Sequence, residues 1–295
     1  LTAHLLKGSK RKVWFGGNIG YSLLPFVEQI KEKDVVVLEL SSFQLDELHR
    51  LRKSPTVSIL TNISPNHLDR HLSFDAYLAA KMGIFCYQEP KNIAIVNYDD
   101  FRARQIIPYI TGRLSLYSIN RKVTPGGYIE NGKFVVDLGK GAKPVTSVKN
   151  LNLQGFFNRS NAIAAIIAAA VLQTPLEQID RLLPEFTGLP HRLEFVDERY
   201  GIKFYNDSIS TTPESTIAAA FALPEPIWLI LGGSNKGLDY TTLAASIIRA
   251  NITGVLGIGE IGNEVLNLIS TVNSKSKRPK TLKLVYTEDF EKTFK

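Results

Sequence analysis

The stretch DVVVLELSSFQL constrains the fold most, because it places a carboxylate at the end of an uninterrupted apolar run. Residues 35–38 are all apolar, as expected of a strand buried on both faces in a parallel sheet. Glu39 follows at the carboxyl end of that strand, the edge where open α/β sheets bind their ligands. A carboxylate there often serves a nucleotide site, but such a site also needs a Gly-rich phosphate loop ending in Gly-Lys-Ser/Thr. This sequence contains no such loop.

Strand-like and helical stretches alternate through the first half of the chain. The expected strands cover 12–15, 35–40, 57–61, 93–97 and 114–119, and a helical stretch covers 74–84. The alternation predicts an α/β fold with a doubly wound, mostly parallel sheet. The stretch GGYIENGKFVVDL then predicts a β-hairpin with a type I′ turn at Asn131 and Gly132. Residues 158–172 predict a long Ala/Ile helix that is buried on most sides.

A second α/β pattern begins after Pro190. Paired strands are expected at 193–196 and 202–205. Further strands are expected at 227–231, 254–258 and 282–286, alternating with helices near 214–222, 241–249 and 262–269. We therefore predict two domains, residues 1–189 and a smaller Rossmann-like α/β domain over residues 190–295.

Composition is that of an ordinary globular protein, with 44% hydrophobic and 21% charged residues. No apolar run reaches the roughly 18 residues of a membrane span, and the single Cys86 excludes an internal disulfide and favours the cytoplasm. The net charge of +7 suggests an anionic partner, although a solvated basic tail explains much of it. That tail contains Lys275, Lys277, Arg278, Lys280 and Lys283. No basic stripe interleaved with aromatic residues supports nucleic-acid binding.

Two polar loops follow expected strands at the same sheet edge as Glu39. The stretch TNISPNHLDRH carries imidazole and carboxylate groups that suit a cation or an oxyanion, and a polar loop with capping roles is the alternative. Its polar residues are Asn62, Asn66, His67, Asp69, Arg70 and His71. In GGNIG, residues 16–20, the glycines let the backbone approach an anion and Asn18 can hydrogen-bond a substrate. A tight turn explains that motif equally well.

Two helical stretches carry further candidates. Lys81 lies in AYLAAKMGIF, where its amine either snorkels to solvent or turns toward the site, and spacing leaves both open. Asn158 and Asn161 are three residues apart, so they share one face near the start of a helix. Asn158 is typical of a helix cap, whereas Asn161 indicates a ligand contact.

The second domain offers polar residues just after a strand. The stretch HRLEF supplies Arg192, and FYNDSISTTPES supplies Asp207 and Thr211, although its Ser, Thr and Pro residues are also typical of a helix start. The stretch LILGGSNKGLDY ends a strand in a Gly-rich turn with Lys236, either an anion anchor or a surface lysine. Its glycine pattern is incomplete for a dinucleotide, which argues against nicotinamide binding.

Taken in order, eight stretches resemble the motifs of the Mur ligase family. They are GGNIG, ELSSFQL, NISPNHLDRH, AAKMGIF, NRSN, LPHR, YNDS and LGGSNKG. The resemblance covers essentially the whole chain. It implies a central ATP-binding domain over 1–189 and a C-terminal Rossmann-like domain over 190–295. An uncapped first helix and a last helix that stops early predict a fragment, with the phosphate loop expected just upstream of Leu1.

The resemblance also implies an activity. It is that of a cytoplasmic, monomeric, ADP-forming ligase of peptidoglycan synthesis that adds glutamate to UDP-N-acetylmuramoyl-L-alanine through an acyl phosphate. Its implied cofactors are ATP and Mg²⁺. Its implied partners are the two substrates, without nucleic acid or membrane insertion.

The resemblance assigns roles to individual residues. Glu39 and His67 hold magnesium, and Lys81 becomes a carbamate that helps to hold a second magnesium ion; these three are the catalytic candidates. Asn18 and Ser41 contact the muramoyl substrate, and Thr211 and Lys236 contact the glutamate carboxylate. The residues expected to contact ATP are Asn158, Asn161, Arg192 and Asp207.

Three positions depart from the family pattern. Asn66 replaces an acidic residue, Phe157 replaces a histidine, and Ile209 replaces a lysine beside the expected glutamate site. The Ile209 departure favours the L-glutamate-adding branch of the family as the alternative, and D-glutamate, the common substrate of the resembling ligases, stays the favoured one. A ligase similar to folylpolyglutamate synthase and a nucleotide-binding fragment without catalysis are further alternatives.

Overall fold

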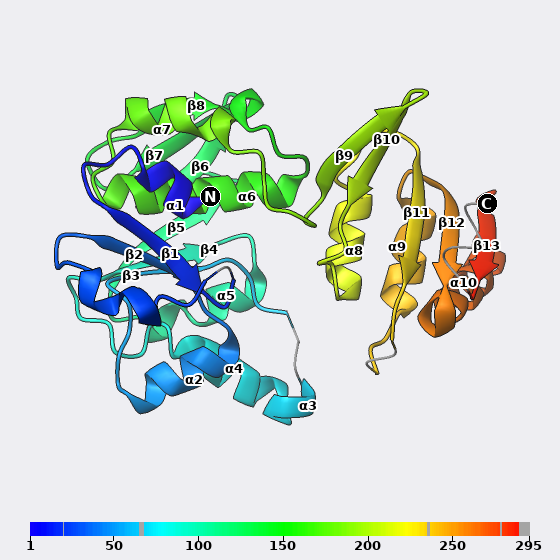
Figure 1. Ribbon diagram of the computed structural model, residues 1–295, viewed down its shortest axis with the longest axis horizontal. Helices are drawn as coiled ribbons and strands as arrows, with labels where there is room; N and C mark the ends of the chain where they lie inside the picture. The colour runs from blue at the N-terminus through cyan, green and yellow to red at the C-terminus, as the bar shows by residue number, and fades with distance from the viewer. Residues whose placement is uncertain (20, 65–67, 235–236, 278, 289–295) are drawn as a thin grey trace. The chain divides into compact units, whose positions relative to one another are not determined.

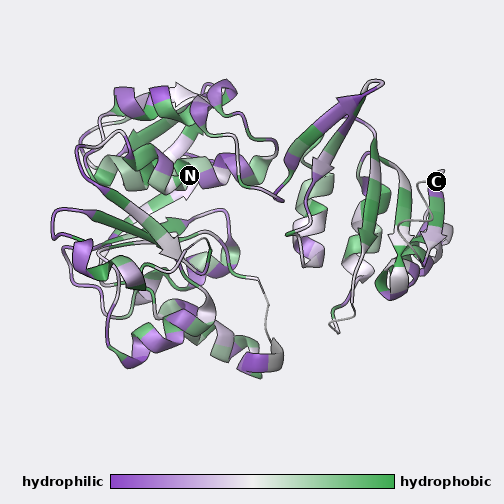
Figure 2. Ribbon diagram, viewed as in Figure 1, coloured by the Kyte–Doolittle hydropathy of each residue, from purple (hydrophilic) through white to green (hydrophobic). Residues whose placement is uncertain are grey.

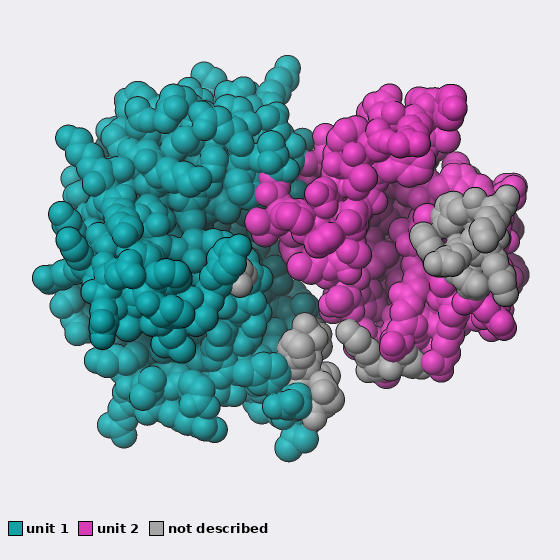
Figure 3. Space-filling model, viewed as in Figure 1, with its two compact units in different colours: residues 1–153, 158–187 teal, residues 154–157, 188–295 magenta. Residues whose placement is uncertain are grey.

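The structure is a computed structural model that describes every residue except 20, 65–67, 235–236, 278 and 289–295 (Figure 1). The chain divides into two compact units, shown in separate colours in Figure 3. Unit 1 comprises Leu1–Leu153 and Asn158–Thr187, and unit 2 comprises Gln154–Phe157 and Gly188–Lys295. The expected division at residues 189 and 190, into an ATP-binding domain and a ligase domain, stays a prediction.

Unit 1 contains two sheets of mostly parallel strands. Strand β1 (Val13–Gly17) pairs in parallel with β2 (Val35–Glu39). The second sheet has the order β3-β4-β5-β6-β7-β8, parallel from β3 to β6 and antiparallel from β6 to β8. Its strands are β3 (Val57–Leu60), β4 (Ile93–Asn97), β5 (Arg113–Ser118), β6 (Gly126–Glu130), β7 (Lys133–Asp137) and β8 (Lys143–Ser147). The predicted α/β fold with mainly parallel strands is confirmed.

Helices are interspersed with the strands up to β5, whereas β5 to β8 follow one another without an α-helix. The helices are α1 (Thr2–Leu6), α2 (Ser42–Arg50), α3 (Leu68–His71), α4 (Phe74–Met82), α5 (Phe101–Gln105), α6 (Phe156–Val171) and α7 (Leu176–Leu182). Short 3₁₀ helices cover Leu24–Gln29, Ile107–Tyr109, Val148–Asn150 and Leu183–Glu185. The main core of unit 1 forms where α6, buried from Ala162 to Ala169, packs with residues of both sheets, including Val35 of β2 and Ile95 of β4. Hydrophobic residues accordingly line these strands in Figure 2.

The expectation that β2 is buried on both faces is wrong. Val35 belongs to the main core, but Val36 is 41% exposed and Leu38 is 47% exposed. Side chains alternate between the two faces of a strand, so only one face of β2 meets the core. On the other face, the chain around Leu23 and Phe26 covers Gly16 and Trp14 of β1 rather than β2. The apolar run therefore predicts the strand correctly and its environment incorrectly.

The hairpin prediction is confirmed. Strands β6 and β7 pair in antiparallel register from Gly126 with Asp137 to Glu130 with Lys133. Asn131 and Gly132 between them have φ values of 50° and 71°. A type I′ turn requires positive φ at both central residues, which Asn and Gly tolerate best.

Gly17, the last residue of β1, is required by close backbone packing. Its φ is +107°, and a Cβ atom there would lie 2.2 Å from the carbonyl oxygen of Glu39. Gly17→Ala should therefore lower the free energy of unfolding of unit 1 by at least about 1–3 kcal/mol, measured by urea denaturation. Gly139→Ala is the control, because Gly139 also has positive φ but has nothing within 4 Å. Equal losses of unfolding free energy in the two variants would show that a Cβ atom at position 17 does not clash with the carbonyl oxygen of Glu39.

Unit 2 is a smaller α/β unit. Strands β9 (Glu194–Arg199) and β10 (Ile202–Asn206) form an antiparallel pair. The parallel sheet β11-β12-β13 contains β11 (Ile227–Gly232), β12 (Ile252–Ile258) and β13 (Lys283–Thr287). Its helices are α8 (Pro213–Ala220), α9 (Thr241–Arg249) and α10 (Gly259–Ser274). The predicted strand pair and the helix at 241–249 are confirmed, whereas α10 begins three residues before its predicted start.

The start of α6 also differs from its prediction. The helix begins at Phe156, just after Gly155 with a φ of +91°, and not at Asn158. Asn158 is a typical cap residue, but the positive φ of Gly155 breaks the backbone earlier and the helix starts directly after it. Among the described residues, no helix is long and apolar enough to cross a membrane.

Candidate functional site

The ends of β1 and β2 bring two predicted site residues together in unit 1. The parallel register pairs Gly17 with Glu39, and the backbone N–H of Asn18 donates to the carbonyl oxygen of Glu39 at 2.8 Å. Both side chains are exposed at the carboxyl end of the strands. A carboxylate and an amide thus face solvent at the edge where parallel sheets bind ligands.

Ser41 lies beside Glu39 and begins α2. Its hydroxyl accepts from the backbone N–H of Gln44 at 3.3 Å, and its own N–H donates to Gln44 Oε1 at 2.9 Å. This reciprocal capping box satisfies backbone donors that the helix leaves unpaired. The arrangement fixes the turn that follows Glu39, and Ser41 therefore has a structural role in addition to its predicted substrate contact.

Lys81 of α4 is a cation whose charge interacts with that of Glu39. Its side chain is half-buried, with Nζ 5.7 Å from the ring centroid of Tyr77. Burial lowers the pKa of the Lys81 amine, and the negative charge of Glu39 partly opposes that effect. The two groups are thus within electrostatic reach, and Lys81 is not a fully solvated lysine. Of the two readings left open by the sequence, the inward one agrees better with this burial.

Asn158 and Asn161 share one face of α6, as predicted. The amide of Asn161 donates to Asn158 Oδ1 at 3.4 Å. Because α6 begins at Phe156, Asn158 lies within the first turn and is not its cap. The buried hydroxyl of Tyr117 lies 3.4 Å from the carbonyl oxygens of Leu60 and Thr61. Tyr117 also bonds Ser160 of α6, so it connects the end of β3 with the turn that carries both asparagines.

In unit 2, the stretches LPHR and YNDS pack against each other. The Asp207 carboxylate accepts from the backbone N–H of Leu193 at 2.8 Å and from the Ser210 hydroxyl at 2.6 Å. The Asn206 amide lies 2.8 Å from His191 Nδ1. These bonds hold the end of β10 against the residues that flank Arg192, whose side chain is exposed. Two of the residues predicted to contact ATP, Arg192 and Asp207, are therefore neighbours in the structure.

Asp207→Ala removes the hydrogen bonds from Leu193 and Ser210 and leaves these part-buried donors unpaired. It should lower the free energy of unfolding of unit 2 by about 1–3 kcal/mol. Trp228 is the one tryptophan of unit 2, so its fluorescence in a Trp14→Phe background follows this unit. Ser210→Ala removes one bond only and should lose less. If Asp207→Ala lowered the free energy of unfolding less than Ser210→Ala does, the Asp207 carboxylate would not hold this part of unit 2 together.

Of the remaining candidates, Thr211 is described by the structure, whereas two others are not. Thr211 is exposed and precedes Thr212, the N-cap of α8, so the predicted helix start is confirmed there. His67 and Lys236 lie outside the described residues. Within the described part of the chain, no three His, Cys, Asp or Glu side chains gather as a metal cluster. Glu39 nevertheless fits a magnesium site, because an exposed carboxylate is the hard oxygen ligand that Mg²⁺ prefers.

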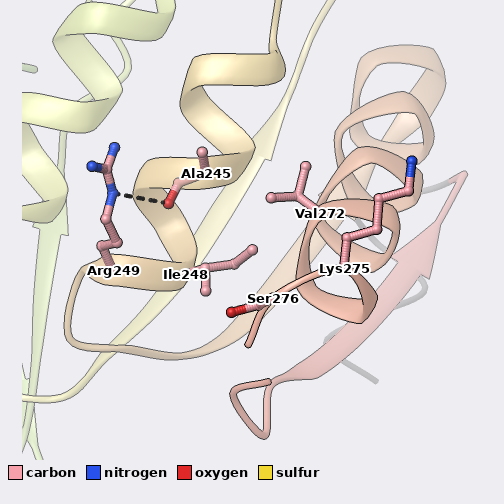
Figure 4. Close-up of a pocket in the computed structure, with 6 residues that line it drawn as sticks. All are labelled: Ala245, Ile248, Arg249, Val272, Lys275 and Ser276. Carbon is pink, nitrogen blue, oxygen red and sulfur yellow. Dashed lines mark hydrogen bonds between the residues drawn. The ribbon is translucent and has the colours of Figure 1, made fainter. Parts of the chain in front are cut away.

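A hollow of about 400 Å³ lies between α9 and α10 in unit 2 and contains none of the predicted site residues (Figure 4). Arg249 donates from Nε to the carbonyl oxygen of Ala245 at 3.3 Å, and Lys275 caps the end of α10. Lys280 Nζ likewise donates to the carbonyl oxygen of Ala250 at 2.5 Å. Cations near helix C-termini are stabilising. Two residues of the basic tail, Lys275 and Lys280, thus have places in the structure of unit 2.

The fold and these side chains define an α/β protein with polar groups at the carboxyl ends of its parallel strands. A family model described as the Mur ligase middle domain matches residues 6–169, more than half of the chain. The chain belongs to the Mur ligase family. The resemblance inferred from the eight motifs is thereby confirmed.

Curated relatives are similar to most of the chain. A UDP-N-acetylmuramoylalanine--D-glutamate ligase from Desulfitobacterium hafniense strain Y51 is 40% identical over 265 residues, covering 90% of this chain and 58% of the relative. One from Symbiobacterium thermophilum is 38% identical over 260 residues, covering 87% and 56%. The chain therefore spans somewhat more than half the length of these relatives.

Solved structures share the fold. A crystal structure of MurF from Acinetobacter baumannii matches with a TM-score of 0.69 and 17% identity, covering 97% of this chain and 70% of that one. MurF ligase from Thermotoga maritima in complex with ADP matches with a TM-score of 0.66 and 17% identity, covering 97% and 73%. At this identity, the likeness establishes the fold alone.

Sequence reasoning missed the residues that hold the candidate site in place. Ser42 and Gln44 lie inside the quoted stretch ELSSFQL, where the spacing of Ser41 and Gln44 is the signal of a capping box, whereas Tyr117 lies outside all eight stretches. His71 was noted only as one polar residue of its loop. Ser42 and His71 are 29 residues apart in the chain, and Tyr117 and Leu60 are 57 apart, so only the folded structure reveals these two contacts.

Proposed function

We propose that this chain carries a large part of an ATP-dependent, ADP-forming ligase. The reaction joins glutamate to UDP-N-acetylmuramoyl-L-alanine in peptidoglycan precursor synthesis. The observation that carries this proposal is the likeness to D-glutamate ligases at 34–40% identity over 83–94% of the chain. D-glutamate is favoured because those relatives carry it in their names.

In unit 1, Glu39 and His67 are proposed to hold magnesium, and Asn18 and Ser41 to bind the muramoyl substrate. Magnesium, when bound, neutralises phosphate charge during phosphoryl transfer. The lowered pKa of Lys81 increases the fraction of neutral amine, which is the form that combines with carbon dioxide to give a carbamate. This supports the proposal that Lys81 acts as a carbamate ligand for a second magnesium ion.

The proposed reaction has two steps. A carboxylate oxygen of the alanine moiety bonds to the γ-phosphorus of ATP, and the bond from that phosphorus to the bridging oxygen of ADP breaks. The glutamate amine then attacks the acyl carbon, phosphate leaves with its electron pair, and the amine gives up a proton. Positioning supplies much of the acceleration of such steps, because several anionic groups must be held together.

In unit 2, cationic and hydroxyl groups suit the anionic ligands. Arg192 and Asp207 are proposed to contact ATP, which is also the role proposed for Asn158 and Asn161 of unit 1. Thr211 and Lys236 are proposed to bind the carboxylate of the incoming glutamate. Arginine and lysine are the usual partners of phosphate and carboxylate groups.

One observation favours the L-glutamate-adding branch as a second candidate. Ile209 is 49% exposed two residues after Asp207, where the D-glutamate branch usually has a lysine. An exposed isoleucine cannot pair with a carboxylate, so this position contributes no charge to amino-acid binding.

ADP formation by the natural full-length protein tests the proposal. ATP and magnesium are supplied with UDP-N-acetylmuramoyl-L-alanine and either D- or L-glutamate, and with a folate acceptor in a separate assay. We expect ADP only with the muramoyl substrate and D-glutamate. Activity with L-glutamate alone would establish the second candidate, and activity with folate alone would establish a folylpolyglutamate synthase-like ligase. No ADP in any assay, or a full-length sequence without a Gly-Lys-Ser/Thr loop, would overturn the ligase proposal.

A further inference from the structure

His71, at the end of α3, touches two helices at once. Its Nε2 atom lies 2.8 Å from the hydroxyl of Ser42, the first residue of α2, which is 2% exposed. Its ring stacks on Phe43 with centroids 5.1 Å apart and planes 3° from parallel. The same ring meets Tyr77 of α4 edge-on at 5.5 Å. One imidazole therefore occupies the contact between the first turn of α2 and α4.

Each of these helices is tied to one of the candidate charged groups. Ser42 is three residues after Glu39, and the capped start of α2 at Ser41 makes the connection short and rigid. Tyr77 is one helical turn before Lys81 and contacts its amine. A change in the spacing of α2 and α4 must therefore change the separation between Glu39 and Lys81.

We propose that His71 is a positioning residue that bridges α2 and α4 and thereby fixes the separation between the Glu39 carboxylate and the Lys81 amine. The bridge itself is structural, and its importance for catalysis rests on the proposed function. Residues that orient groups around a metal site commonly change activity or metal affinity when they are replaced.

The chemistry of the contact explains why a histidine suits this position. An apolar ring would preserve the contacts with Phe43 and Tyr77, but it would leave the buried hydroxyl of Ser42 without its imidazole partner. An unpaired buried polar group is costly, and we expect the first turn of α2 to shift so that the Ser42 hydroxyl regains a partner. Imidazole both stacks like an aromatic ring and hydrogen-bonds through its edge.

The first test compares His71→Phe, Ser42→Ala and the double variant in the full-length protein. We expect each single variant to lower kcat about ten-fold and to raise the magnesium concentration for half-maximal activity about ten-fold. Because both changes break the same bond, the double variant should be no worse than the single ones. If the fold-losses in kcat of the two single variants multiplied in the double variant, His71 and Ser42 would act independently, and the proposed bridge would be wrong.

A second test needs no activity. Acetylation of Lys81 by a lysine-selective reagent is followed by mass spectrometry in the absence of substrates and metal. We expect Lys81 to react several-fold faster in His71→Phe and in Ser42→Ala, because α2 and α4 separate. His49→Phe is the matched control, since His49 also lies in α2 but contacts Tyr87, which is outside the candidate site. That variant should leave the rate for Lys81 unchanged.

The two tests separate this inference from the proposed function. If the wild-type protein forms no ADP, the ligase proposal fails while the acetylation rates still test the bridge. If the wild-type protein is active and His71→Phe only lowers Tm, with kcat, magnesium dependence and acetylation of Lys81 within two-fold of wild type, His71 is a packing residue. That result would overturn the inference.

Discussion

Glu39→Gln is expected to lower kcat of the full-length protein about 10²–10³-fold with little loss of stability. Glutamine has nearly the same shape, so the strand and the capped start of α2 should persist. The variant nevertheless loses the negative charge at the carboxyl end of β2. Losing one preorganised electrostatic group of an active site typically costs two to three orders of magnitude in kcat. Steady-state ADP formation at saturating substrates and magnesium measures the effect.

Glu47→Gln is the matched control for this change. Glu47 lies in α2, exposed, and forms a surface ion pair with Arg50 at 2.8 Å. Exposed pairs of this kind contribute little. We expect kcat of Glu47→Gln to stay within two-fold of wild type. A Glu39→Gln enzyme with equally unchanged kcat would show that Glu39 has no part in the reaction.

Lys81→Met is expected to abolish activity and yet to stabilise unit 1. Methionine fills similar space without the charge that burial disfavours, as the lowered pKa of Lys81 indicates. We expect Tm to rise by about 2–4 °C, the shift that roughly 1 kcal/mol gives in a domain of this size. Gains in stability at the cost of activity are typical of functional sites. Calorimetry and ADP formation measure the two effects.

The gain should depend on pH. Folded Lys81 has a lowered pKa, so the charged form is penalised in the folded state below that pKa. The penalty disappears as the pH rises from the folded pKa toward the ordinary lysine value of 10.5. The Tm difference between Lys81→Met and wild type should therefore shrink at high pH in metal-free protein.

Lys91→Met is the control for the charge itself, because Lys91 is exposed and pairs with Glu89. It should leave activity unchanged and should not raise Tm. A fully active Lys81→Met enzyme would refute a role for this amine. An unchanged or lowered Tm of Lys81→Met would show that burying the charged Lys81 amine does not destabilise unit 1.

Much of the fold could be predicted from local patterns. The hairpin turn at Asn131 and Gly132 follows from backbone chemistry that few other residue pairs satisfy, and the α/β class follows from alternating strands and helices. Helix starts follow less directly from the sequence, because α6 begins after Gly155 rather than at the polar Asn158. Periodicity indicates which segments form elements more strongly than where they end.

The environment of each element was harder to predict. The apolar run of β2 suits burial on both faces, but burial depends on which segments pack against it, and Val36 remains exposed. Likewise, the residue pattern alone leaves Lys81 either snorkelling to solvent or turned toward the site, and only the family resemblance groups it with Glu39. Their proximity, and the His71 contact between their helices, arise from packing of segments that are distant in the chain. Pairings of that kind leave no local signal.

The most direct measurement follows oxygen from substrate to phosphate. The full-length protein is incubated with ATP, D-glutamate and UDP-N-acetylmuramoyl-L-alanine whose alanine carboxylate carries ¹⁸O in both positions. An acyl-phosphate ligase must release inorganic phosphate that contains one ¹⁸O atom per molecule of amide formed, because the attacked carbonyl loses the oxygen it gave to phosphorus. Mass spectrometry of phosphate and product should show this one-to-one transfer. Amide formation with unlabelled phosphate, or ADP formation without amide, would contradict the proposed reaction.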